Sequence, residues 1–251
     1  MTLISKTLHS QESATSNTTQ PQGAAAFEIM QFQKSAVSNT LHTQASLRMD
    51  EAIDVLNILD DTQVFEYGPR KASLRELAVW MIVLSDNTST NALIDALGFR
   101  AVNEYAASLG LRKTALRRKM LDFASREAGI DNVTSASDMF LLFKHLFREG
   151  ARDFSEAIEI LRRQRSHDKL TRYIWEDVSI AHKTGGLDYL SHDAGVFSFK
   201  AKDYKEENII DVFAGVFLWN TKDSKGDDRL IGRIGRLIFE YYAYNGKNCI
   251  G

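Results

Sequence analysis

The hydrophobic pattern of this 251-residue chain changes its period near residue 177, and this change constrains the fold more than any other feature. Before that point, apolar residues recur every three to four positions, as in amphipathic helices. After it, three runs are typical of strands, at 177–185, 193–201 and 208–220. Short connections favour an antiparallel meander, and a final helix over 227–244 has an apolar face to cover it. The pattern predicts an α+β protein.

The helical part has clear start and stop signals. Its strongest helix begins at Ser73, where Ser73 and Glu76 match a capping box, and continues to Ser85. Further helices are expected over 89–97, up to Leu109, over 136–149 and over 154–165, with a loop over 112–133. No internal repeat is visible, so these helices belong to one block and not to an array.

The N-terminal part is less regular. Residues 1–23 are rich in Ser, Thr and Gln and predict a disordered tail. We expect a single domain over 24–251, in which 24–165 is mainly helical and 166–251 forms the sheet and the last helix. The first helix expected in it lies within "GAAAFEIMQFQKSAV". Residues 39–70 show no regular pattern.

Composition excludes several classes of partner and site. A net charge of -2 gives no electrostatic basis for binding nucleic acid or an anionic membrane. The single cysteine, Cys249, excludes an intrachain disulfide, and no His, Asp or Glu cluster has metal-ligand spacing, so no metal or cofactor is expected. The start of the chain resembles no signal peptide, and no run is long enough to span a membrane, which predicts a cytoplasmic location.

Two triplets suggest a binding site. Ser85-Asp86-Asn87 follows the strongest helix, and Lys183-Thr184-Gly185 ends the first strand of the meander. Alone, the first would more often be a helix cap and the second an exit from a strand. Together, on these elements and in this order, they indicate a site. The second triplet offers the Lys183 ammonium, the Thr184 hydroxyl and a backbone at Gly185 that a ligand can approach closely. These groups can bind a substrate carboxylate.

With these triplets, the chain resembles the class A β-lactamases and the related penicillin-recognising serine hydrolases. The resemblance includes "SLRELAVWMIVLSDNTSTNALIDALG" and "HKTGGLDYLSHDAGVF" and continues into the last helix. It implies hydrolysis of a β-lactam or a peptidoglycan-type D-Ala-D-Ala peptide through an acyl-serine, without a cofactor, in a family whose members are often exported. Ser85 would relay protons and Asn87 would contact the substrate amide. The substrate carboxylate would be bound by Lys183, Thr184 and Gly185.

The nucleophile motif of this family, Ser-x-x-Lys, is missing from its place. The only match, Ser166 to Lys169, follows the Ser-Asp-Asn triplet instead of preceding it. The expected register puts Ala25 at the nucleophile and Glu28 at the lysine, at the start of a helix, and predicts a Glu28–Lys183 ion pair beside Ser85. Because an alanine cannot attack a carbonyl, lost or very weak catalysis is predicted.

The resemblance is incomplete in two other places. Class A enzymes place a glutamate base in their Ω-loop, but "RRKMLDFASREAG" has Lys119, Met120 and Asp122 near that position, and its first glutamate is Glu127. The family's N-terminal helix and strands are expected to be missing, which would expose an edge of "NIIDVFAGVFLWN" and cause self-association. A non-catalytic ligand- or partner-binding relative and a truncated gene product are the alternatives to a hydrolase.

Two histidines near the Lys-Thr-Gly triplet have competing interpretations. His182 lies on the strand directly before Lys183, and packing is favoured over catalysis. His192 and Asp193 precede the second strand, where shaping a pocket and starting a strand are about equally favoured.

Overall fold

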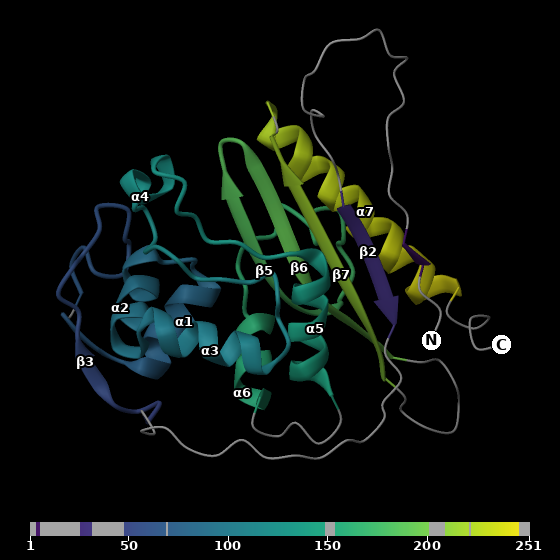
Figure 1. Ribbon diagram of the computed structural model, residues 1–251. Helices are drawn as coiled ribbons and strands as arrows, with labels where there is room; N and C mark the ends of the chain where they lie inside the picture. The colour runs from purple at the N-terminus through teal and green to yellow at the C-terminus, as the bar shows by residue number, and fades with distance from the viewer. Residues whose placement is uncertain are drawn as a thin grey trace, which may run out of the picture. The chain divides into compact units, whose positions relative to one another are not determined.

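The chain divides into two compact units in the computed structural model. The sheet unit comprises Met1–Gln33 and Ser166–Gly251, and the helical unit comprises Lys34–Arg165 (Figure 1). The structure describes residues 4–5, 26–31, 48–68, 70–148, 154–200, 209–220 and 222–245. No helix within these ranges is long and apolar enough to cross a membrane.

Within the described residues, the sheet unit contains five antiparallel strands, which makes the expected α+β class correct. Their order across the sheet is β1 (Ile4–Ser5), β2 (Ala26–Gln31), β7 (Ile209–Trp219), β6 (Leu190–Lys200) and β5 (Ser179–Leu187). The last three form the predicted meander, so β5 lies at one edge of the sheet (Figure 1).

One face of this sheet packs against the last helix, α7 (Ser224–Asn245), as its apolar face predicted. Phe197, Val212 and Ile231 are fully buried in this core. A side chain at Gly235 would collide with the Leu170 carbonyl, because a Cβ built there lies 1.9 Å from that oxygen. Glycine is therefore needed for α7 to approach the turn that precedes β5.

The N-terminal predictions need correction. Ala26–Gln31, expected in a helix, forms β2 and pairs with β7, and Ile4–Ser5 pairs with β2 in turn. The expected loss of strands is therefore wrong, and the β7 edge is covered. An unpaired edge of β7 would offer a row of backbone hydrogen-bond partners to residues 26–31. Pairing with this edge stabilises a strand more than the weak local pattern of these residues stabilises a helix. Except for Ile4–Ser5, the expected disordered tail lies outside the described residues.

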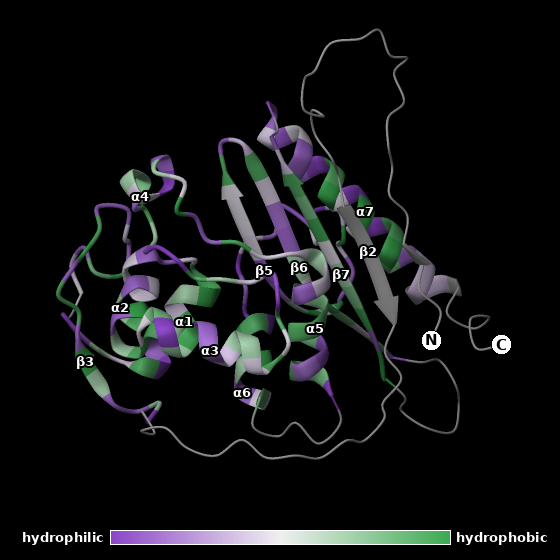
Figure 2. Ribbon diagram, in the orientation of Figure 1, coloured by the Kyte–Doolittle hydropathy of each residue, from purple (hydrophilic) through white to green (hydrophobic). Residues whose placement is uncertain are grey.

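The helical unit follows the predicted helices closely. Ser73 caps α1 (Leu74–Val83) with the complete capping box, and the helix packs in a core around Leu77 and Phe65. The other helices are α2 (Asn87–Leu97), α3 (Phe99–Ser108), α4 (Phe123–Glu127), α5 (Ala136–Phe147) and α6 (Ser155–Arg162). Two elements were not predicted: the short α4, and the hairpin of β3 (Ala52–Asp54) with β4 (Lys71–Ser73). Green, hydrophobic segments recur along α1 and α2 in Figure 2.

Candidate active site

The Ser-Asp-Asn triplet forms the connection between α1 and α2 in the helical unit. Asp86 is the N-cap of α2 and is only 6% exposed. Its carboxylate accepts hydrogen bonds from the Ser89 backbone and hydroxyl, both at 2.6 Å, and from the Thr62 hydroxyl at 2.5 Å. The capping role was one of the two interpretations of the triplet, and in the structure it belongs to the middle residue.

Ser85 is exposed next to this cap and has an unusual backbone. Its φ is 56°, in the left-handed region that serine rarely adopts. The strain is maintained because the Trp80 carbonyl accepts from both Leu84 and Asp86, on either side of Ser85. Strain of this kind is often retained at functional positions.

Asn87, the third residue of the triplet, begins α2 and is half-buried. Its side-chain amide donates to the Asp61 carboxylate at 2.5 Å. The next residue, Thr88, accepts from the Leu59 backbone at 3.0 Å. Residues 59–62 therefore hold the start of α2 through its first three side chains. Asp86 accepts from Thr62, Asn87 donates to Asp61, and Thr88 accepts from Leu59.

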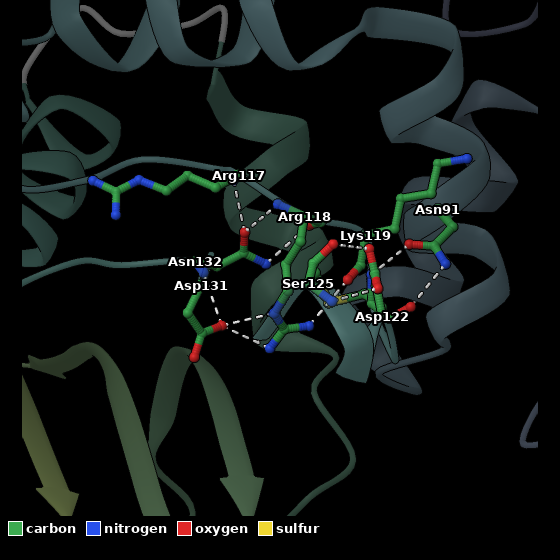
Figure 3. A network of polar contacts seen from close by, with 9 residues as sticks. Asn91, Arg117, Arg118, Lys119, Asp122, Ser125, Asp131 and Asn132 are labelled. Atoms are coloured by element: carbon green, nitrogen blue, oxygen red, sulfur yellow. Dashed lines mark hydrogen bonds and ion pairs between the residues drawn. The ribbon is translucent and has the colours of Figure 1, made fainter. Parts of the chain in front are cut away.

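The loop over 112–133 is closed by a network of side chains (Figure 3). Arg118, only 9% exposed, donates to one carboxylate oxygen of Asp131 at 2.7 Å. Asn132 accepts from the Arg117 and Arg118 backbones and donates to the Arg118 carbonyl. Ala115 and Val133 pair their backbones at the neck of the loop. The segment is thus a compact loop held by an Arg118–Asp131 ion pair, at the place where the resemblance implied an Ω-loop.

Met120 occupies the part of this loop where the resemblance places a glutamate base. Asn91 of α2 holds it from both sides, accepting from the Met120 N–H at 2.7 Å and donating to its carbonyl at 3.2 Å (Figure 3). The nearby Asp122 caps α4, and hydrogen bonds from the Ser125 hydroxyl and backbone lower the pKa of its carboxyl. This carboxyl lacks the raised pKa that general-base catalysis near neutrality requires.

The Lys-Thr-Gly triplet lies on β5, at the edge of the sheet unit. Lys183 is half-buried and donates to the Thr184 carbonyl at 2.7 Å. Burial lowers the pKa of Lys183 to about 8; the Asp193 carboxylate opposes this shift and the Lys169 ammonium adds to it. In the sheet, Lys183 pairs with Ala194 of β6, which in turn pairs with Gly215 of β7.

Lys169 provides a second buried cation in this unit. Its side chain is 8% exposed, and its ammonium lies 3.0 Å from Asp228, which also accepts from Ser191 at 2.5 Å. A Cβ added to Gly186 would lie 3.7 Å from the same ammonium. In the sequence, Lys169 stands out only as the lysine of the misplaced Ser-x-x-Lys match. That match does lie in the connection between α6 and β5, outside any helix, and no local signal indicates its burial.

His182 is buried, in agreement with the packing interpretation. It is 1% exposed, and its Nδ1 lies 2.9 Å from the fully buried Asp193 carboxylate. Asp193 also accepts from the Leu170 backbone at 3.0 Å. Asp193 therefore links β5 and β6 to the turn that carries Lys169. His192, the second uncertain histidine, is half-buried, and burial lowers its pKa, while the hydrogen bond with the Ser191 carbonyl opposes this.

The structure does not support the predicted replacement of the nucleophile motif. Glu28 pairs with Gly215 of β7, and β7 and β6 separate it from Lys183 on β5. Three strand spacings are about 14 Å, so the predicted Glu28–Lys183 ion pair is wrong. Ala25 lies outside the described residues, and the segment that follows it is a strand where the register required a helix.

The triplets belong to different units. Ser85 and Asn87 are in the helical unit, whereas Lys183, Thr184 and Gly185 are in the sheet unit. Among the described residues, no group of three His, Cys, Asp or Glu side chains could hold a metal ion.

A family model described as the β-lactamase enzyme family matches residues 27–242. The chain belongs to this family. A search of the curated proteins found no match. Among solved structures, a β-lactamase from Sphaerobacter thermophilus is 25% identical with a TM-score of 0.65, covering 78% of this chain and 74% of its own.

A second similar structure is a mutant of PBP-A, solved as an acyl-enzyme complex with penicillin G. It is 23% identical with a TM-score of 0.66 and covers 78% of this chain and 73% of its own. A third, the TLA-3 extended-spectrum β-lactamase, is 15% identical with a TM-score of 0.66, covering 77% of this chain and 76% of its own. These two likenesses support the class A fold, and the family model supports descent from serine hydrolases.

Proposed function

We propose that this β-lactamase relative is a pseudoenzyme that binds β-lactams or D-Ala-D-Ala-type peptides through their carboxylate without hydrolysing them. The observation that carries the proposal is the contrast between its binding and catalytic groups. The Lys-Thr-Gly triplet, to which the resemblance assigns carboxylate binding, is intact on an edge strand of the described sheet, with a second buried lysine in the same unit. The nucleophile motif and the Ω-loop base are missing.

The binding groups are suited to a small anion. Lys183 and Lys169 are close enough for the charge of one to lower the pKa of the other. A carboxylate placed near both would offset their mutual repulsion and gain charge-assisted hydrogen bonds. As an edge strand of the described sheet, β5 also offers backbone groups to an extended ligand. A peptide or a β-lactam side chain has matching amide groups.

The catalytic groups do not support turnover. No serine in the chain has a lysine three positions later except Ser166, whose lysine is paired with Asp228. Met120 cannot accept a proton, and Asp122 caps a helix. Without a nucleophile, the rest of a serine hydrolase site retains about 10³–10⁴-fold catalysis over water at most. Slow hydrolysis with Ser85 as a substitute nucleophile is the competing function.

Calorimetry with benzylpenicillin and with an acyl-D-Ala-D-Ala peptide, alongside intact-mass measurement, tests the proposal. We expect saturable binding of at least one ligand, no added mass, and affinity reduced at least tenfold in Lys183→Ala. Lys144→Ala, which removes an exposed lysine of α5, is the matched control and should bind normally. A covalent adduct that disappears in Ser85→Ala would make the protein an enzyme, and absence of binding to both ligands would refute the binding role.

A further inference from the structure

The outward face of α7 carries a stripe of large apolar residues. Leu230, Leu237, Tyr241 and Tyr244 are 44%, 65%, 47% and 59% exposed. Their spacings of seven, four and three residues place them on one side of the helix. Ile231, Ile238 and Phe239 are buried against the sheet on the other side. Green and purple segments alternate along α7 in Figure 2, in agreement with these two faces.

The stripe continues onto the turn before β5. Trp175 is 84% exposed, and its neighbour Glu176 accepts from Arg236 at 2.6 Å and from the Tyr244 hydroxyl at 3.4 Å. The exposed patch therefore consists of a tryptophan, two tyrosines and two leucines, next to arginines. Trp, Tyr and Arg dominate the energy of protein–protein interfaces, and contiguous exposed apolar patches mark such interfaces.

One charged residue lies within the stripe and indicates the orientation of the partner. Arg233 is exposed one turn before Leu237, and it makes no ion pair with any residue in the described part of the chain. If two α7 helices pair antiparallel about Leu237, Arg233 of each lies opposite Tyr241 of the other. Leu230 then lies opposite Tyr244. A parallel pair would instead place Arg233 against its own copy.

We propose that the outward face of α7 binds a second copy of this chain as a two-fold antiparallel helix pair centred on Leu237. An Arg guanidinium over a tyrosine ring is favourable, which makes the stripe complementary to itself. The inference does not depend on ligand binding. It also places self-association on a surface different from the β7 edge expected from the sequence, because β2 pairs with that edge.

The chain itself offers a poor alternative cover in its N-terminal segment. Residues 6–25 contain Leu8 as their only bulky apolar residue, so they have little to bury on the stripe.

The size of the patch sets the strength of association. A 22-residue helix is about 33 Å long, and one helix pair lies near the lower end of stable interface areas. The dimer should therefore be weak and depend on protein concentration.

Sedimentation velocity of the full chain over a concentration series tests the dimer. We expect a monomer–dimer equilibrium whose dissociation constant rises at least tenfold in Leu237→Glu, because two carboxylates would meet at the two-fold axis. Leu97→Glu, at a 46% exposed leucine of α2, is the matched control and should stay within twofold of the parent. A monomer at every concentration, or an unchanged dimer in Leu237→Glu, would overturn the proposal.

A cross-linking variant tests the geometry separately. Leu237→Cys, in a Cys249→Ser background, should form a disulfide-linked dimer under mild oxidation, because a residue on the axis meets its own copy. Disulfides require Cα atoms about 4.4–6.8 Å apart, which only close pairing at Leu237 allows. Leu97→Cys in the same background should stay monomeric. If Leu237→Cys fails to cross-link while Leu237→Glu weakens the dimer, the antiparallel two-fold arrangement is refuted.

Discussion

A buried charge in the helical unit, Asp86, and a half-buried charge in the sheet unit, Lys183, are held in different ways. In the helical unit, the buried Asp86 carboxylate accepts three hydrogen bonds and caps a helix. In the sheet unit, Lys183 donates to a carbonyl, yet burial still lowers its pKa to about 8. A charge with as many partners as Asp86 stabilises a fold, whereas a charge that its surroundings disfavour is typical of a binding site.

Substituting Asp86 should have the largest effect. Asp86→Ala removes the N-cap of α2 and leaves the buried Thr62 and Ser89 hydroxyls without their acceptor. We expect a loss of about 3 kcal/mol in the free energy of unfolding, measured with urea. Asp61→Ala, which removes an exposed acceptor from the same loop, should cost much less. Equal losses would contradict a structural role specific to Asp86.

Lys183 should behave in the opposite way, because removing it should stabilise the protein. Its folded pKa of about 8 lies below the ordinary 10.5, so the fold disfavours its charge at pH 7. Lys183→Met should raise the free energy of unfolding by up to about 3 kcal/mol. The gain should be full below pH 8 and shrink as pH rises to 10.5, where the unfolded lysine also loses its proton. Destabilisation at pH 7 in urea would contradict this assignment.

Asn91 tests whether the Ω-loop depends on its clamp. Asn91→Ala removes both hydrogen bonds to the Met120 backbone and should cost about 2 kcal/mol. Hydrogen exchange at the Met120 amide should accelerate. Asn103→Ala is a matched control, since Asn103 holds the Leu116 backbone with the same two bonds. Asn103→Ala should lower the free energy of unfolding by a similar amount without changing hydrogen exchange at the Met120 amide. Faster exchange at Met120 in both variants would show that Asn91 is not a local clamp.

If Lys183 binds a ligand carboxylate as proposed, its pKa sets the pH range of binding. Below pH 8 the ammonium is charged and attracts a carboxylate, and above pH 8 it loses its proton. The affinity for benzylpenicillin should therefore fall about tenfold between about pH 7 and pH 9, measured by calorimetry. The methyl ester of the same penicillin lacks the carboxylate and should show a flat profile. A fall of equal size for both compounds would exclude recognition of the carboxylate by Lys183.

The smallest effect is expected at Ser85. Ser85→Gly should stabilise the protein by about 0.5 kcal/mol, because glycine adopts the observed φ of 56° without strain. Ser137→Gly, near the start of α5, should instead destabilise by a similar amount, because glycine there only increases the entropy of the unfolded chain. If Ser85→Gly is destabilising in urea, the Ser85 side chain makes a net favourable contribution to the fold.

Local sequence determined most of the helices and strands and the positions of the two triplets. The capping box at Ser73 and the three strand-like runs of the meander depend on neighbours in the chain. They were predicted correctly for this reason. The triplets could also be located, although Lys183-Thr184-Gly185 lies within β5, which continues to Leu187, and does not end the strand as predicted. The absence of Ser-x-x-Lys ahead of Ser85 is likewise a property of the sequence alone.

Tertiary structure decided what depends on distant partners. Ala26–Gln31 is a strand because β7 offers an edge to pair with, and its own residues specify a helix about as well. Lys169 belongs with Lys183 because a tight approach at Gly235 brings α7 and its Asp228 to the turn before β5. Asn91 anchors Met120 across 29 residues of sequence. Burial and long-range hydrogen bonds arise only when separate segments meet, so no local pattern encodes them.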